Sequence, residues 1–291
     1  MAISLREIAS YLGQFLSQIP LPGIGSTSCL PGDIINPSYE ALSGAPSCPL
    51  DGPMSCHNST PVAGDSCCFV YPGGRMLLTQ FWDQHVHAGG AEEGWTLHGL
   101  WPDLCDGTYD QFCHMTPQYR NITEVLEHYG HHDLVRFMNR YWLSDYGPNS
   151  NLWEHEFNKH ATCINTLAPK CYGSSHQPGM EVVDYFVRAA ALFRTLDTYH
   201  ALEKSGIVPH PRKHYPLADV QKALEEYSGG KVVLRCGGRR DVLHEAWYHY
   251  FIKGSLQTGE FIPAKDLGKN GDAGNCAPWI KYLPKRRKGE L

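Results

Sequence analysis

The alternation of hydrophobic and polar residues predicts strands near the two ends of a folded region and amphipathic helices between them. Strand-like patterns occupy residues 76–82, 95–102, 232–236 and 243–252. Pro102 is expected to end the second of these strands. Helical spacing of apolar residues occurs in residues 122–129, 133–142, 152–163, 181–199 and 217–227. These elements predict an α+β fold, in which helices surround a central antiparallel sheet.

Proline and glycine punctuate the first part of the chain and set it apart from the rest. We expect an N-terminal signal or pre-domain segment in residues 1–44, one folded domain in residues 45–284 and a basic tail in residues 285–291. Residues 8–19 are apolar but interrupted by polar side chains, so they fit either a weak signal peptide or a short amphipathic segment. No apolar run reaches the roughly 18 to 20 residues that span a bilayer, so no membrane partner is expected.

The charge balance excludes binding of nucleic acid through bulk positive charge. The 291 residues contain 25 basic and 30 acidic side chains, for a formal net charge of -5 at pH 7. A protein of this kind that acts on RNA must bind it through a local site. Protonation of all 16 histidines would change the formal charge from -5 to +11. The molecule therefore becomes cationic near about pH 5, which suits an acidic compartment.

The 11 cysteines indicate an oxidising compartment. None of them forms a CxxC pair, and the adjacent Cys67 and Cys68 are better placed to anchor two separate disulfides than to bind one metal ion. Two glycosylation sequons, at Asn58 and Asn121, agree with a secretory route. We therefore expect a secreted protein.

One predicted helix carries an unusual set of reactive side chains. A step of four residues turns a helix by about 400°, which places Glu156 and His160 on one face. His155 and Lys159 have the same spacing and lie on the adjacent stripe. A charged amphipathic helix with ion pairs between turns is the alternative interpretation. A zinc site is not expected, because His155 and His160 are separated by about 140° around a helix.

A further histidine, His98, lies in the predicted strand of residues 95–102. Alone it would fit a core histidine with satisfied hydrogen bonds. Together with the helix, it completes the set that phosphodiester cleavage needs, since one imidazole takes a proton from the attacking hydroxyl and another protonates the leaving oxygen. A lysine and another histidine stabilise charge on the phosphorane. RNA supplies its own 2′-hydroxyl nucleophile, so neither a metal nor another cofactor is required.

At these residues the chain resembles the RNase T2 family of acid ribonucleases. The segment WTLHGLWP (residues 95–102) and the segment HEFNKHATC (residues 155–163) match the two signatures of the family in the right order. The second departs from the usual pattern at Ala161, where the family has glycine. The resemblance extends over residues 46–282, is strongest to the fungal branch and leaves residues 1–44 uncovered.

The resemblance implies a role for each reactive residue. His160 would act as the base on the 2′-hydroxyl, and His98 would act as the acid on the 5′-oxygen. Glu156 and Lys159 would stabilise the phosphorane, and His155 would bind phosphate. The products would be 2′,3′-cyclic phosphates, which water then opens to 3′-phosphates.

The family also binds its principal base just after the first signature. The matching residues are Trp101, Asp103 and Tyr109. An aromatic plane stacks a base and a carboxylate accepts from an exocyclic amine, so Asp103 would weakly favour bases with an amino group. Packing in the core is the alternative interpretation of Trp101. The expected base preference is broad.

The family pattern further implies five disulfide bonds. The implied pairs are Cys48–Cys68, Cys56–Cys105, Cys67–Cys171, Cys113–Cys163 and Cys236–Cys276. Cys29 is left over in the segment that the resemblance does not cover. It could be free, intermolecular or part of a removed propeptide.

The resulting expectation is a secreted or vacuolar acid endoribonuclease that acts as a monomer on single-stranded RNA and not on DNA. Two histidines that titrate at about pH 5 to 7 predict a bell-shaped pH profile. One rival is a catalytically silent family member used for binding, storage or signalling, which the presence of the complete catalytic set disfavours. The other is a metal-dependent phosphoesterase, which cleavage in the presence of a chelator would exclude.

Overall fold

A computed structural model describes residues 44–49, 51–57, 66–84, 94–267 and 273–285. All of the strands and α-helices named below lie inside the folded domain expected in residues 45–284. The predictions for residues 1–43 including Cys29, for the sequon at Asn58 and for the tail after Lys285 lie outside the described residues.

Seven strands form one sheet in the described part of the chain. The main path of the sheet runs through β2 (Thr96–Asp103), β1 (Arg75–Phe81), β5 (Val242–Lys253), β7 (Trp279–Lys281) and β3 (His214–Pro216). β4 (Val232–Gly237) and β6 (Glu260–Pro263) also pair with β5. Paired strands are antiparallel apart from β5 and β7, which form one parallel bridge. The predicted α+β class with its largely antiparallel sheet is confirmed.

The strands differ from the sequence prediction in two ways. Pro102 does not end its strand but pairs with Met76, and β2 continues to Asp103. β2 is the last strand on its side of the described sheet, so no strand pairs with its outer edge. Pro102 lacks an N–H group, and no hydrogen bond between strands is lost at that edge. The short strands β3, β6 and β7 contain too few residues for alternation to predict them.

Six α-helices lie in the described chain: α2 (Ile122–His128), α3 (His132–Tyr141), α4 (Asn149–Lys159), α5 (Met180–Arg194), α6 (Thr198–Lys204) and α7 (Leu217–Ser228). The prediction of a single helix in residues 181–199 is wrong, because the helical structure is interrupted between the end of α5 at Arg194 and the start of α6 at Thr198. Asp197 sits at this break, where its side chain accepts a hydrogen bond from the His200 N–H and caps the start of α6.

The helix predicted for residues 152–163 also ends early. α4 stops at Lys159, and a separate 3₁₀ helix (Ala161–Cys163) follows it. His160 lies between the two and serves as the C-cap of α4. This boundary separates two of the predicted catalytic residues, because Glu156 lies in α4 and His160 lies just after it.

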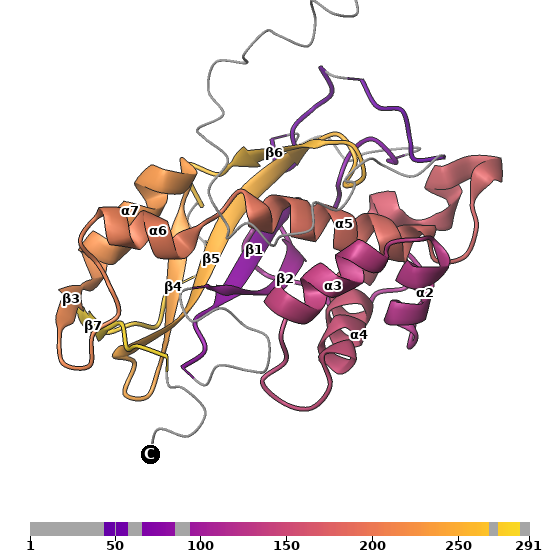
Figure 1. The fold of residues 1–291 in the computed structure, drawn as a ribbon. Coiled ribbons are helices and arrows are strands. Elements are labelled where there is room, and N and C mark those ends of the chain that lie inside the picture. The colour runs from indigo at the N-terminus through magenta and orange to yellow at the C-terminus, as the bar shows by residue number, and fades with distance from the viewer. Residues whose placement is uncertain (1–43, 50, 58–65, 85–93, 268–272, 286–291) are drawn as a thin grey trace, which may run out of the picture.

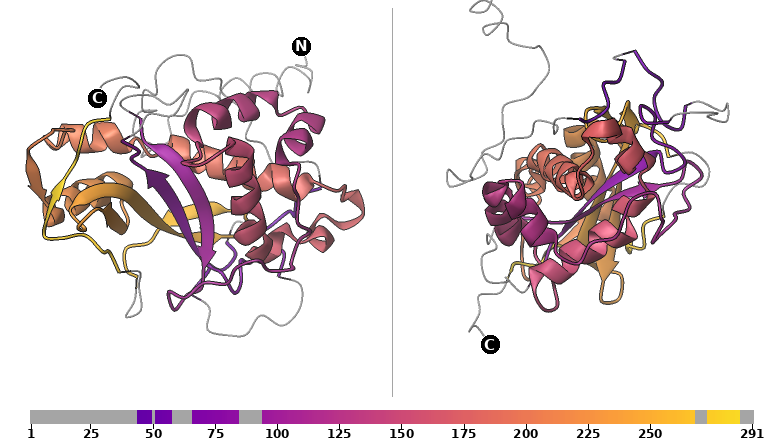
Figure 2. Two further views of the ribbon diagram at one scale, coloured as in Figure 1. Left: turned by 90° about the horizontal axis from the view of Figure 1, so that it is seen from below. Right: turned by 90° about the vertical axis from the view of Figure 1, so that its right-hand side faces the viewer.

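The main hydrophobic core lies between α5 and one face of the sheet (Figure 1). Leu78 of β1 and Leu100 of β2 are fully buried on this face, and the Tyr185 hydroxyl of α5 donates to the Leu100 carbonyl. α2, α3 and α4 gather beyond the β2 edge, as the left view of Figure 2 shows, while α7 packs against β4 and β3. The candidate site is built from residues of β1, β2 and β5 that point to the opposite face.

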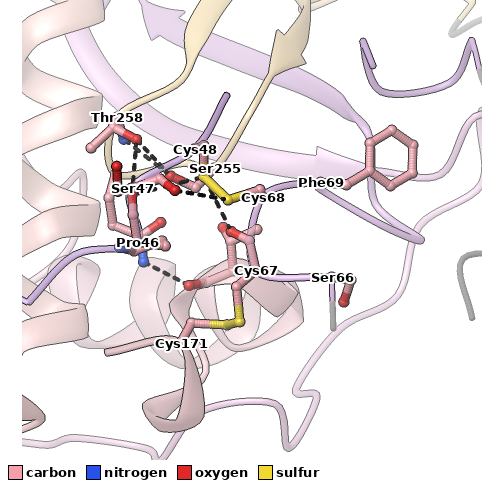
Figure 3. The surroundings of a disulfide bond; sticks show 12 residues. Pro46, Ser47, Cys48, Ser66, Cys67, Cys68, Phe69, Cys171, Ser255 and Thr258 are labelled. Carbon is pink, nitrogen blue, oxygen red and sulfur yellow. Dashed lines mark hydrogen bonds between the residues drawn. A yellow bond between two sulfur atoms is a disulfide. The ribbon is translucent and has the colours of Figure 1, made fainter. Parts of the chain in front are cut away.

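Disulfide bonds join ten cysteines of the described residues, as Cys48–Cys68, Cys56–Cys105, Cys67–Cys171, Cys113–Cys163 and Cys236–Cys276. These are the pairs that the family resemblance implied. The adjacent Cys67 and Cys68 point to different partners, so two bonds fasten one segment to two parts of the chain (Figure 3). The sequon residue Asn121 is exposed at the start of α2. Among the helices of the described ranges, none has the length and apolar character needed to cross a bilayer.

Candidate active site

A β-bulge in β2 sets the position of His98. Thr79 of β1 pairs with Gly99, and the next residue of β1 pairs with Leu97. His98 is therefore the extra residue between two regular pairs, where a bulge redirects the side chain. Trp142 holds the backbone at this point, since its indole N–H donates to the His98 carbonyl at 2.7 Å. The His98 side chain is 20% exposed, so it lies at the mouth of the site.

Helix α4 brings Glu156 to the same place. Glu156 is fully buried, and its Oε2 accepts a hydrogen bond from the Trp101 indole at 2.7 Å. Its Oε1 lies 3.6 Å from His98 Nε2. Gly99 permits this approach, because a Cβ there would overlap Glu156 Oε2 and lie 2.5 Å from Trp101 Nε1. Burial raises the pKa of Glu156, although the charge of His98 and the Trp101 hydrogen bond oppose the shift.

His160 lies one residue beyond α4 but keeps the spacing expected from the sequence. Its N–H still donates to the Glu156 carbonyl at 3.2 Å. Its ring stacks on the Trp101 indole, with ring centres 4.9 Å apart and planes 17° apart. Burial lowers the pKa of His160 to about 2, and the positive charges of Lys159 and His98 add to this effect. The His160 imidazole is therefore neutral and able to accept a proton.

His155 and Lys159 form the accessible side of the site. The His155 ring is exposed, and its centre lies 6.4 Å from that of His160. Partial burial lowers the pKa of His155, with further contributions from the charges of Lys159 and His98. Lys159 is the last residue of α4 and is half-buried. Both side chains are thus accessible to an anionic ligand.

The geometry corrects the sequence argument about metal ligands. His155, Glu156 and His160 each place one potential ligand atom within 4.8 Å of the others. This closeness differs from the separation that helical spacing predicts for His155 and His160. Imidazole and carboxylate groups are ligands that zinc accepts. Spacing alone therefore does not exclude a metal ion, and a chelator provides the decisive test.

The three residues expected to bind a base occupy different environments. Trp101 is partly exposed, and its indole N–H is engaged with Glu156. Asp103 lies at the end of β2, opposite Arg75 in the strand pairing, and is 5% exposed. Tyr109 follows on a loop and is 60% exposed. Trp101 thus contacts the cluster of His98, Glu156 and His160, and joint base binding by the three residues stays a prediction.

β5 contributes two residues that the sequence analysis missed. Glu245 Oε1 lies 3.5 Å from His98 Nδ1, and Glu245 Oε2 accepts a hydrogen bond from the Trp247 indole at 2.7 Å. Phe81 of β1 stacks on the His98 ring, with ring centres 4.0 Å apart. A carboxylate within a largely apolar strand is the signal in the sequence. Alternation does not reveal, however, that this strand pairs with β1 and so lies beside His98.

The sequence is similar to those of known ribonucleases. The family model described as Ribonuclease T2 family matches residues 73–265. Ribonuclease T2 of Aspergillus oryzae is 47% identical over 243 residues, which cover 83% of this chain and 85% of that protein. Ribonuclease Trv of Hypocrea rufa is 44% identical over 82% of this chain and 98% of that protein.

The fold is similar to those of solved structures. Actibind, described as a T2 ribonuclease, is 38% identical with a TM-score of 0.74, covering 82% of this chain and 98% of that chain. Human RNase T2 is 23% identical with a TM-score of 0.51, covering 73% of this chain and 100% of that chain. At this lower identity the likeness concerns the fold alone.

Proposed function

The chain belongs to the ribonuclease T2 family, and on this premise we propose that it is an acid endoribonuclease that cleaves single-stranded RNA by metal-independent transesterification. One observation carries the proposal: Trp101 stacks on His160 and bonds to Glu156, which in turn lies beside His98. Two histidines from different elements thus meet at one site in different surroundings. An acid and a base that act together need such a difference.

The first step forms a cyclic phosphate. Neutral His160 takes the proton of the 2′-hydroxyl as that oxygen attacks phosphorus. His98 gives a proton to the 5′-oxygen as the bond between phosphorus and this oxygen breaks. The products are a 2′,3′-cyclic phosphate and a 5′-hydroxyl. His160 is then protonated and His98 neutral, which are the states needed for water to open the ring to a 3′-phosphate.

The remaining polar groups stabilise the phosphorane. Lys159 at the end of α4 and the exposed His155 one turn before it are accessible donors, and they bind the non-bridging oxygens as negative charge builds there. Protonated Glu156 donates a hydrogen bond to one of these oxygens. Its burial, which raises its pKa, favours that form.

We assign the principal base to Trp101, Asp103 and Tyr109. The partial exposure of Trp101 and the 60% exposure of Tyr109 support this assignment, because they leave aromatic surface for stacking. The Asp103 carboxylate would accept from an exocyclic amine. The base preference is then broad, with a weak bias toward bases that carry an amino group.

The proposed setting is extracellular or vacuolar. Disulfide bonds such as those of this chain form in an oxidising compartment, and the exposed Asn121 is accessible for glycosylation. Residues 1–44 would be a signal or pre-domain segment, residues 45–284 the catalytic domain and residues 285–291 a basic tail. The enzyme would act as a monomer, without a cofactor, and it would spare DNA because DNA lacks the 2′-hydroxyl.

Cleavage of matched oligonucleotides in excess EDTA tests the proposal. At about pH 5, the protein should cut an RNA strand to fragments ending in 2′,3′-cyclic phosphate and leave the 2′-O-methylated strand intact. Cleavage of the methylated strand would contradict transesterification. Loss of cleavage in EDTA that returns with added zinc would favour the metal-dependent phosphoesterase, and no cleavage by the oxidised protein under any condition would favour the silent binding protein.

A further inference from the structure

His98 lies between two carboxylates that belong to different elements. Glu156 Oε1 of α4 lies 3.6 Å from Nε2, and Glu245 Oε1 of β5 lies 3.5 Å from Nδ1. Both distances exceed those of ordinary hydrogen bonds. His98 Nδ1 and Glu156 Oε1 accordingly have no hydrogen bond among the described residues. In a free enzyme such contacts are often long and tighten when substrate binds.

The Glu245 carboxylate is held firmly in place. It is 13% exposed on the central strand of the sheet, and the Trp247 indole donates to its second oxygen. The Arg235 guanidinium covers the Trp247 ring at 4.9 Å. Burial alone would raise the pKa of Glu245, but the contact with His98 and the Trp247 hydrogen bond outweigh it, and the pKa lies below its ordinary value. Glu245 is therefore an ionised group with one oxygen directed at His98.

The plane of the His98 ring is fixed by its aromatic neighbours. Phe81 stacks on one face at an interplanar angle of 19°, and Trp101 meets the ring edge-on at 84°. What these contacts leave open is the placement of the proton, because both ring nitrogens lie near a carboxylate. An ionised acceptor at Nδ1 favours the proton on that nitrogen and also favours the doubly protonated ring.

We propose that Glu245 is the positioning residue of His98: its carboxylate accepts the Nδ1 proton, stabilises the charged ring and so presents Nε2–H to the leaving 5′-oxygen. The role rests on the proposed ribonuclease function, in which His98 is the acid. In this role Glu245 acts through His98 rather than on the substrate. Glu156, on the other nitrogen, is then free to serve the phosphorane.

A substitution of Glu245 changes one charge among several that act on His98. Among the described residues, the titratable and charged groups that act on His98 or on its partners include Glu245 and His244 of β5, Glu156, His155 and Lys159 of α4, and His160 at its C-cap. Glu245→Gln keeps the size of the side chain, removes its charge and leaves one accepting oxygen in place of two. A shift in the titration of His98 therefore reports the loss of this charge.

The test compares the pH profiles of kcat/KM for wild type, Glu245→Gln and Glu245→Asp. For Glu245→Gln, kcat/KM should fall about 10- to 100-fold, and the alkaline limb should move to lower pH by about one unit, since a proton on His98 is less stable without the anion. Glu245→Asp retains the charge and should keep its alkaline limb closer to that of wild type. Glu260→Gln, at an exposed position of β6, is the matched control and should leave the profile unchanged.

An NMR titration of His98 separates this proposal from the proposed function. The titration midpoint of His98 should fall by about one pH unit in Glu245→Gln whether or not the protein cleaves RNA. An unchanged midpoint, in a variant whose unfolding temperature matches wild type, would overturn the role of Glu245. A shifted midpoint in a wild-type protein that cleaves no RNA would instead refute the proposed function while the His98–Glu245 pair stands.

Discussion

At the scale of single residues, the surroundings of each histidine decide what it does. His160 is 6% exposed and lies near other positive groups, so it stays neutral over a wide range of pH. His98 is 20% exposed and lies between Glu156 and Glu245. In the proposed mechanism one residue type thus supplies both a base and an acid, and burial together with neighbouring charges makes the difference.

The lowered pKa of His160 determines the acid limb of the pH profile. The neutral ring is the active form of a base, and a lowered pKa preserves that form as the pH falls. The acid limb of kcat/KM should therefore lie below about pH 4, lower than two ordinary histidines would give. Initial rates on a dinucleotide between pH 3 and 8 measure it. An acid limb between pH 5 and 7 would contradict the burial of His160 as the controlling factor.

The close contacts of Gly99 lead us to expect that a Cβ atom at this position lowers both activity and stability. In Gly99→Ala the Cβ would overlap Glu156 Oε2, so the Glu156 carboxylate must shift, which disturbs its hydrogen bond with Trp101. We expect kcat/KM to fall more than about tenfold and the free energy of unfolding to drop by about 1 to 3 kcal/mol. Gly237→Ala on β4 is the control, because its Cβ would meet nothing within 4 Å. Equal activity of the two variants would refute the tight approach.

At the scale of elements, the sequence indicates the strand and helix that carry the site but not how they meet. The spacing of Glu156 and His160 is preserved because the His160 N–H still bonds to the Glu156 carbonyl at the helix end. The bulge at His98 depends on strand register, which no local pattern encodes. Glu245 escaped prediction for the same reason, since its place beside His98 follows from the pairing of β5 with β1.

The chain after β2 is fastened to the end of α4 by one disulfide and two backbone bonds. Cys113 joins Cys163, the Phe112 N–H donates to the Lys159 carbonyl at 2.9 Å, and the Met115 N–H donates to the Thr162 carbonyl at 3.2 Å. Replacing Cys113 and Cys163 by Ser should lower the free energy of unfolding by about 4 kcal/mol, from the loop of 50 residues that the bond closes.

The same replacement should reduce activity, because Lys159 and His160 lie at the fastened end of the helix. Denaturant unfolding and kcat/KM of the double variant provide the two measurements. The pair Cys236–Cys276, which is not attached to α4, closes a loop of similar length, 40 residues, and serves as the control. If loss of this second bond lowered activity as much as loss of the first, the first would have no special role at the site.

At the scale of the whole molecule, adaptation to acid has two opposing parts. Histidine protonation turns a chain of formal charge -5 into a cation, which attracts RNA as the pH falls. Buried histidines act against stability under the same conditions. Burial, with the charge of Arg75, lowers the pKa of His249 to about 3. The pKa of His160 is lowered further. Disulfides offset this cost through the unfolded state.

The buried histidines predict the sign of the pH dependence of stability. Below about pH 6.5, His249 and His160 are protonated in the unfolded chain but stay neutral in the folded one. Each group therefore lowers the free energy of unfolding by up to about 1.4 kcal/mol for each pH unit of acidification. Glu156 acts in the opposite direction, because its pKa is raised. In guanidinium unfolding, the loss of stability between pH 7 and pH 4 should be smaller for His249→Gln than for wild type. An equal loss would show that His249 is not buried neutral.

The proposed reaction is the cleavage of RNA by His98 and His160 together, without a metal ion. Its most direct test is digestion of single-stranded RNA at about pH 5 in excess EDTA by wild type, His98→Ala and His160→Ala. We expect wild type to release 2′,3′-cyclic phosphates and each substitution to lower the rate by at least about a hundredfold. Cleavage at the wild-type rate by either variant, or wild-type cleavage that EDTA abolishes, would contradict it.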